Sequence, residues 1–320
     1  MSTRKILMLA FALALAAALL FYSLRGIDWR ECGRILAGAS LPLLAVAIVL
    51  TSVTLFLRAC RWRVLLNSTL RIGVGRAFWA TAAGYFGNNF LPARGGELVR
   101  TYMIASRPGE LAFVLTTALA ERVADALALV TIASIVLLVH PVASGWMAGA
   151  ARPVAIAAIA AVVAIGVVPL FGRFFERIIA RLPLPDRVKY LLHHAVEQGM
   201  EGLRAFHDVG RLTEFLALTA VIWTIDGLAT MVGGAVLGLH IPLMVAFLLL
   251  AGLGLGSALP STPGYVGIYQ FVAVSVLTPF GFTRTQAIAY ILVAQALSYV
   301  VMGIWGALAF WRYRQPGFAK

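Results

Sequence analysis

Three ionisable residues lie close together inside a long apolar stretch: Glu121, Arg122 and Asp125 interrupt the run from Glu110 to Val139. Each ionisable side chain at the centre of a membrane-spanning helix costs roughly 2.5–3.5 kcal/mol, so the cluster must face protein or a cavity. Glu121 and Asp125 are four residues apart and share one helix face, and Arg122 can pair with Asp125. Two acids against one arginine leave excess negative charge, which favours a site for a lipid head group or a coupling proton over a self-neutralised structural ion pair.

A second group of polar residues surrounds a break in another apolar stretch and comprises Asn88, Asn89, Arg94, Glu97 and Arg100. The arginines can offer forked donors to a phosphate, and a helix that starts after the break can point free N–H groups at an anion. The asparagines can instead bond the free backbone groups of the broken helix. For the arginines the alternative is an anchor at the cytoplasmic surface, with equal weight for Arg94 and favoured for Arg100.

Charged residues also mark two further apolar stretches. Arg58 and Arg61 stand just beyond the predicted end of a span, where an interfacial anchor is favoured over a site for anionic lipid head groups. Asp226 is a lone acid inside another span and is therefore a functional candidate, with Arg122 as a candidate partner. At helical spacing it shares one stripe with Thr219, Trp223 and Thr230.

The rest of the sequence must supply the elements that hold these residues. Of its 320 residues, 61% are hydrophobic and 12% charged, and the mean hydropathy is +0.92. Soluble domains average ~45–50% apolar and ~25% charged residues, so a water-soluble globule is excluded, as is a nucleic-acid-binding tail despite the net charge of +13. We predict an all-α polytopic membrane protein, a single domain over 1–320. The predicted full spans are Ile6–Leu24 (uncleaved), Leu41–Leu57, Glu110–Val139, Pro153–Phe171, Thr213–Leu239 and Thr285–Phe310.

Two more apolar stretches, 75–107 and 241–282, are interrupted by proline and glycine. Broken backbone cannot face lipid, so we predict two re-entrant helical hairpins. Both breaks contain Leu-Pro with a glycine four residues after the proline, one in each half of the chain, which indicates an inverted repeat; two unrelated kinks are the alternative. The polar residues of the second break can satisfy backbone groups or line a path. The candidate site residues of this break are Ser261, Pro263, Gly264 and Gln270.

The basic residues predict an orientation. With the N-terminus in the cytoplasm and the hairpins at 75–107 and 241–282 entering from opposite faces, 20 of the 26 basic residues are cytoplasmic and 5 are outside. This distribution follows the positive-inside rule and places the C-terminus in the cytoplasm as well. The halves 1–139 and 213–311 are joined by the connector 172–212, which is either an amphipathic interfacial helix or, the favoured interpretation, a linker.

Several kinds of chemistry lack their usual residues. The sequence contains no GxxxxGK[ST], HExxH or GxSxG motif, which argues against an ATPase, a zinc hydrolase or a serine hydrolase. The two cysteines, Cys32 and Cys60, stand at opposite ends of one predicted span, so we expect neither a disulfide nor a metal site. No cofactor is expected.

Four motifs together carry a resemblance to a known family. In order along the chain they are Arg58-x-x-Arg61-Trp62, Asn89-x-x-Pro92-x-x-x-Gly96-Glu97-x-x-Arg100, Glu121-Arg122-x-x-Asp125 and Pro263-Gly264-x-x-Gly267. The set resembles the transmembrane-region family of lysylphosphatidylglycerol synthase and is similar to the membrane flippase domain of the multiple peptide resistance factor. Some stand-alone members of that family accompany hopanoid genes.

The resemblance implies a flippase of the bacterial inner membrane that moves a phospholipid, lysyl-lipid or polyprenyl-linked head group between leaflets, and no enzyme activity. Members often carry an acid where this chain has Gln270; if that acid couples protons, Glu121, Asp125 or Asp226 must replace it. Two alternatives stay open: a membrane subunit of a lipid-modifying transferase, and a scaffold for a separate synthase. The expected partners are membrane lipids with an anionic or polyprenyl-linked head group, with no nucleic acid; a homo-oligomer and a lipid-synthesising enzyme also stay open.

Overall fold

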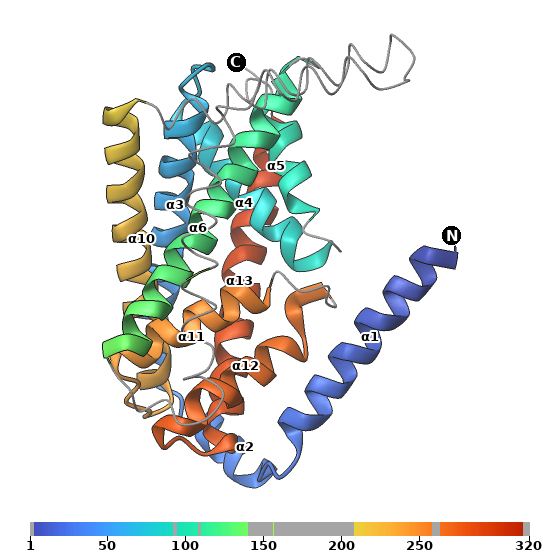
Figure 1. Cartoon of the computed structure of the whole chain (residues 1–320), viewed down its shortest axis with the longest axis vertical. Coiled ribbons are helices and arrows are strands. Elements are labelled where there is room, and N and C mark those ends of the chain that lie inside the picture. The colour runs from blue at the N-terminus through green and yellow to red at the C-terminus, as the bar shows by residue number, and fades with distance from the viewer. Residues whose placement is uncertain are drawn as a thin grey trace.

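Every secondary-structure element that the structure describes is helical (Figure 1). The computed structural model describes residues 3–91, 95–107, 110–139, 156, 208–257 and 263–315. Ten α-helices and two short 3₁₀ turns lie in these ranges, which contain no strand. The helices are α1 (Thr3–Leu24), α2 (Trp29–Ala37), α3 (Leu41–Leu66), α4 (Val74–Phe90), α5 (Gly96–Ile104), α6 (Leu111–Val139), α10 (Val209–Val236), α11 (Leu243–Gly256), α12 (Ile268–Leu277) and α13 (Arg284–Tyr313), with η5 (Pro263–Tyr265) and η6 (Thr278–Phe280).

The long helices agree with the predicted spans in position, with one difference in length. Among the described helices, α3, α10 and α13 are long and apolar enough to cross a membrane. The prediction that the second span ends at Leu57 is wrong, because α3 continues to Leu66. Arginine is a good helix former, so the basic residues after Leu57 do not end the helix. The predicted span Pro153–Phe171 and most of the connector 172–212 lie outside the described residues.

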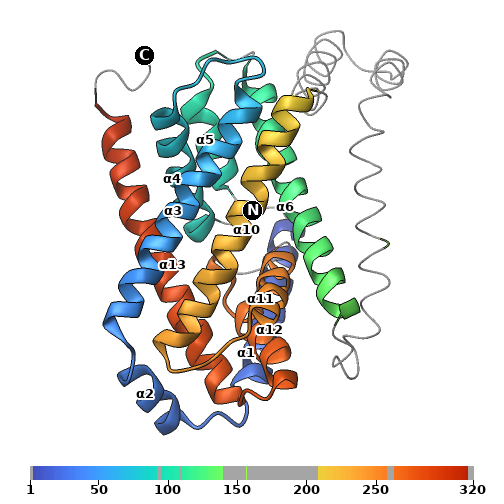
Figure 2. The same cartoon turned by 90° about the vertical axis from the view of Figure 1, so that its left-hand side faces the viewer.

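Each predicted break lies between two short helices. The first short pair is α4 with α5, and the second short pair is α11 with α12. In both views the first short pair lies in the upper half of the bundle and the second in the lower half (Figures 1 and 2). The prolines that form the break, Pro92 and Pro260, are outside the described residues.

The two sets of four helices, α3–α6 and α10–α13, pack in corresponding ways. α4 packs on α13 of the other set, and its counterpart α11 packs on α6. Within each set the short helices pack on each other, and the first helix contacts the second. α3 and α10, the first helices of the two sets, pack directly against one another. Each set of helices therefore packs on the other through corresponding helices.

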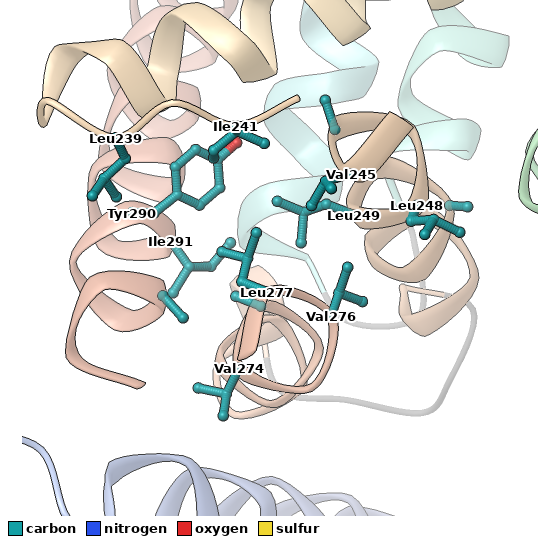
Figure 3. Close-up of a cluster of buried hydrophobic side chains, with 14 of the residues drawn as sticks. Leu239, Ile241, Val245, Leu248, Leu249, Val274, Val276, Leu277, Tyr290 and Ile291 are labelled. Atoms are coloured by element: carbon teal, nitrogen blue, oxygen red, sulfur yellow. The ribbon is translucent and has the colours of Figure 1, made fainter. Parts of the chain in front are cut away.

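Apolar side chains fix the second short pair against α13 (Figure 3). Leu249 of α11, Leu277 of α12 and Ile291 of α13 meet there, and none is more than 1% exposed. A second core surrounds Trp62 of α3 and includes Phe113 of α6. Close packing of this kind holds the polar residues between the two cores in defined positions.

Glycines allow α4 and α5 to approach closely. A Cβ atom on Gly87 would lie 2.8 Å from the Cα of Gly96, and one on Gly96 would collide with the carbonyl oxygen of Gly84. At such distances even one added methyl group forces the backbones apart. The first short pair therefore depends on these glycines for its geometry.

We predict that Gly96→Ala destabilises the protein by about 1–3 kcal/mol, the usual cost of overpacking. The measurement is unfolding of the purified protein in detergent. Gly303→Ala is the matched control, because Gly303 is also helical and a Cβ there meets nothing within 4 Å. The control should gain roughly 0.5–1 kcal/mol from the loss of a helical glycine. Equal effects of the two substitutions would contradict the close approach.

Candidate functional site

Four helices bring four arginines and four acids into one ionic network. All eight side chains belong to α3, α5, α6 and α10, and every one makes at least one ion pair of 3.4 Å or less. Their formal charges cancel. The members of the network are Arg58, Arg61, Glu97, Arg100, Glu121, Arg122, Asp125 and Asp226.

One side of the network is sealed inside the bundle. Arg61 is fully buried; its Nη2 lies 3.0 Å from Glu121 Oε1, and its Nη1 lies 2.7 Å from Asp125 Oδ1. Arg100 reaches the other oxygen of Glu121 from α5, with Nη1 at 2.7 Å, and also pairs with Glu97 at 2.6 Å. A buried charge that loses its partner is strongly destabilising, so these pairs fix α3, α5 and α6 relative to one another.

The other side of the network is more open. Arg58 Nη2 on α3 donates to Asp226 Oδ2 on α10 at 2.6 Å, and Nη1 donates to Asp125 Oδ2 at 3.4 Å. Arg122 Nε donates to Glu97 Oε1 at 2.7 Å, whereas its contact with Asp125 is 3.7 Å long. The Arg58–Asp226 pair joins the two sets of helices directly.

An aromatic ring lies against each of the four guanidinium groups. The distances from the guanidinium carbon to the ring centroid run from 4.4 to 5.2 Å. Such cation–π contacts stabilise a desolvated guanidinium by about 2 kcal/mol. The four pairs are Arg58 with Trp223, Arg61 with Phe215, Arg100 with Trp62 and Arg122 with Tyr85.

A cavity of about 440 Å³ borders the more open side of the network. Helices of both sets line it, together with the turn of the second short pair, and its ionic wall consists of Arg58, Arg122, Asp125 and Asp226 among the described residues. Four of its lining residues each keep one buried polar atom without a hydrogen-bond partner: Asn88 Oδ1, Asn89 Nδ2, Arg122 Nη2 and Trp223 Nε1. These four atoms are themselves buried behind the cavity surface, and Asn88 Oδ1 lies against Gly96 of α5. The polar groups that a ligand in the cavity meets are therefore those of the ionic wall.

The turn of the second short pair is held by two amides. Gly264, Tyr265 and Gly267 all have positive φ, at 75°, 59° and 91°. Gln270 accepts a hydrogen bond from the Gly267 N–H at 2.8 Å and donates to Gln295 Oε1 at 2.6 Å. Gln295 of α13 in turn donates to the Gly264 carbonyl at 2.9 Å. These two backbone groups of the unwound segment, the Gly264 carbonyl and the Gly267 N–H, are thus satisfied by amides and without any charged residue.

The pattern of one protein family, the lysylphosphatidylglycerol synthase TM region, matches residues 9–306 of the chain. The chain belongs to this family. It is therefore a multi-pass membrane protein. Among known proteins it is also similar to one named glycosyltransferase AglD from Haloferax volcanii, with 28% identity over 315 residues. That match covers 87% of this chain and 50% of the relative, so the chain spans about half of the relative's length.

In this member of the family, two predictions about charge partners are wrong. The cluster of Glu121, Arg122 and Asp125 carries no excess negative charge, because arginines from α3 and α5 pair with both acids. Asp226 pairs with Arg58 and not with Arg122. Helices distant in sequence supply these partners, and the spacing within one helix carries no information about them.

The favoured role of membrane-surface anchor is wrong for three arginines. Arg61 and Arg100 are at most 1% exposed, and the Arg58 side chain is 11% exposed. They lie within the bundle because α3 extends beyond its predicted end and α5 folds back along α4. Arg94 and Ser261 lie outside the described residues. Pro263 begins the turn η5.

The structure adds two residues to the site that the sequence analysis did not single out. Tyr85 lines the cavity beneath Arg122, and Gln295 holds the turn of the second short pair. Gln295 is an amide inside the apolar run 285–310, which is a recognisable signal of an internal role in a membrane helix. Tyr85 has no such signal, because tyrosine is common at membrane interfaces.

We predict that Arg61→Met costs about 3–5 kcal/mol of stability, because it leaves Glu121 and Asp125 short of a buried partner. The measurement is unfolding in detergent, with Arg71→Met as the control, since Arg71 is exposed. Adding Glu121→Gln to Arg61→Met should restore part of the loss. A loss for Arg61→Met no larger than for the control would show that the network does not stabilise the fold.

Proposed function

We propose that this protein moves a lipid between the two leaflets of the bacterial inner membrane. The polar head group passes through the cavity while the apolar chains stay in the bilayer. The observation that carries the proposal is the cavity itself, which lies among membrane helices yet has an ionic wall. Its volume of about 440 Å³ is within the ~300–1,000 Å³ of small-molecule sites.

The corresponding packing of α3–α6 and α10–α13 supports an inverted repeat. In our proposal the two short pairs are re-entrant and enter the membrane from opposite faces, with both termini in the cytoplasm. Transporters built this way bind substrate near the midplane, where the repeats meet, and open to each side in turn. Helices of both sets line the cavity, which supports a mechanism of this kind.

The Arg58–Asp226 pair can couple binding of the head group to movement of one set of helices against the other. It joins α3 to α10, the two helices through which the sets contact each other. A head group that accepts a hydrogen bond from Arg58 competes with Asp226 and weakens the contact between α3 and α10. Binding would then favour movement of one set against the other, because a ligand shifts a conformational equilibrium by its differential contacts.

A lipid-modifying transferase is the second candidate, and the relative named as a glycosyltransferase favours it. In that case the cavity holds the acceptor lipid, and a further domain or a partner protein carries out the transfer. A scaffold for a separate synthase would need neither a bound lipid nor its movement. Both alternatives use the same membrane region, so the lipid product distinguishes them.

We expect purified protein in vesicles to accelerate movement of a labelled lipid from the inner to the outer leaflet, measured by chemical quenching of the label. Vesicles without protein are the control. Mass spectrometry of the recovered lipids should find no new covalent species. A new species would support the transferase, and an unchanged movement rate across all lipids supplied would contradict the flippase.

We predict that Trp223→Leu slows this movement about tenfold, because it removes the ring that lines the cavity and stabilises the Arg58 guanidinium. Trp311→Leu is the matched control, because Trp311 is exposed and lies outside the cavity wall. Equal rates for the two variants would show that the head group does not contact Trp223 as it moves.

A further inference from the structure

The charges on the cavity wall are balanced. Arg58 and Arg122 contribute two positive charges, and Asp125 and Asp226 contribute two negative charges. No lysine, histidine or glutamate lines the cavity among the described residues. A head group that enters it therefore meets a polar surface with no net charge.

The layer behind the wall does not change this balance. Arg61 and Arg100 face Glu97 and Glu121 there, again two charges of each sign. A head group with a net charge would leave that charge uncompensated inside the protein, which is costly at low dielectric. The membrane potential would in addition oppose outward movement of a net positive head group by ~2.3 kcal/mol per 100 mV.

The hydrogen-bonding groups around the cavity are mixed. The guanidinium groups of Arg58 and Arg122 only donate hydrogen bonds, and the carboxylates of Asp125 and Asp226 only accept them. A bare anion offers no donor to the carboxylates, and a bare ammonium offers no acceptor to the guanidinium groups. A ligand with both kinds of group can bond to both.

Aromatic rings make up much of the remaining polar wall. Tyr265 and Tyr269 from the second short pair stack with their centroids 5.0 Å apart and an interplanar angle of 11°. Tyr290 and Tyr299 of α13 also line the cavity. Aromatic faces attract an ammonium group and also pack against the apolar face of a sugar ring.

Resting on the proposed function, we infer that the lipid carried by this protein has a head group without net charge that offers both hydrogen-bond acceptors and donors. A zwitterionic phosphate–amine head group has this chemistry, and so does an uncharged sugar. The balanced wall disfavours lipids with a net negative or net positive head group.

The experiment compares four labelled lipids in otherwise identical vesicles containing the full chain. They are phosphatidylethanolamine (zwitterionic), a monoglycosyl diacylglycerol (uncharged), phosphatidylglycerol (net negative) and lysylphosphatidylglycerol (net positive). We expect at least one of the first two lipids to move about tenfold faster than either charged lipid. The faster of the two shows whether the head group is a zwitterionic phosphate–amine or an uncharged sugar. A charged lipid that moves as fast as the best neutral lipid overturns the inference and leaves the proposed function intact.

Asp226→Asn tests the cause directly, because it leaves the wall with one net positive charge and keeps its shape. The ratio of phosphatidylglycerol to phosphatidylethanolamine movement should rise about tenfold. Glu214→Gln is the matched control, since Glu214 is an exposed acid on the same helix and does not line the cavity. An unchanged ratio for a folded Asp226→Asn protein overturns the inference. If this variant does not fold, the preference of the unsubstituted protein decides.

Retention of the same four lipids during purification, measured by native mass spectrometry, separates the two proposals. Selective retention of a neutral lipid without any movement supports the inference and contradicts the flippase. If the protein neither retains nor moves any of the four lipids, that result contradicts both the inference and the proposed function.

Discussion

The pairing of buried charges is the constraint on which the rest of this structure depends. A guanidinium group or carboxylate inside a membrane protein is tolerated only when it is paired and hydrogen-bonded. Arg61 meets this condition by bonding to Glu121 and Asp125 on α6 and to Thr219 on α10. Because its partners lie on two other helices, α3, α6 and α10 can pack in only one register. Arg100 adds α5 to the same arrangement, so the first short pair folds back into the bundle.

The network has a structural side and an open side, and this division explains how ionic groups can serve both stability and binding. The pairs around Glu121 have no contact with the cavity and stabilise the bundle. The pairs of Arg58 and Arg122 border the cavity, where a ligand can exchange with a carboxylate. The exchange leaves the sealed pairs intact, and these hold the helices while the cavity changes its occupant.

The sequence was sufficient to predict the long helices that the structure describes, the two breaks and the placement of the α6 cluster inside the protein, because hydropathy, proline and the cost of burying charge are local properties. It did not predict the short helix α2. It was not sufficient to predict the partners. Arg58 and Arg61 follow the last purely apolar turn of their span, which in most membrane helices marks the interface. Only the packing of α3 on α6 and α10 shows that acids on these two helices pair with both arginines. Tyr85 and Gln295 were missed for the same reason, since their roles depend on contacts with other helices.

The two short pairs pack in corresponding ways but contribute different kinds of side chain to the site. The first brings Glu97 and Arg100 into the ionic network, whereas the second presents Gln270 and a stacked pair of tyrosines. An acid at Gln270 would have no basic partner among the residues that hydrogen-bond to it, which are Gly267 and Gln295. The amide suits the position because it donates and accepts at once. The cavity consequently has an ionic side and an uncharged aromatic side, and a head group with separate polar and apolar faces fits between them.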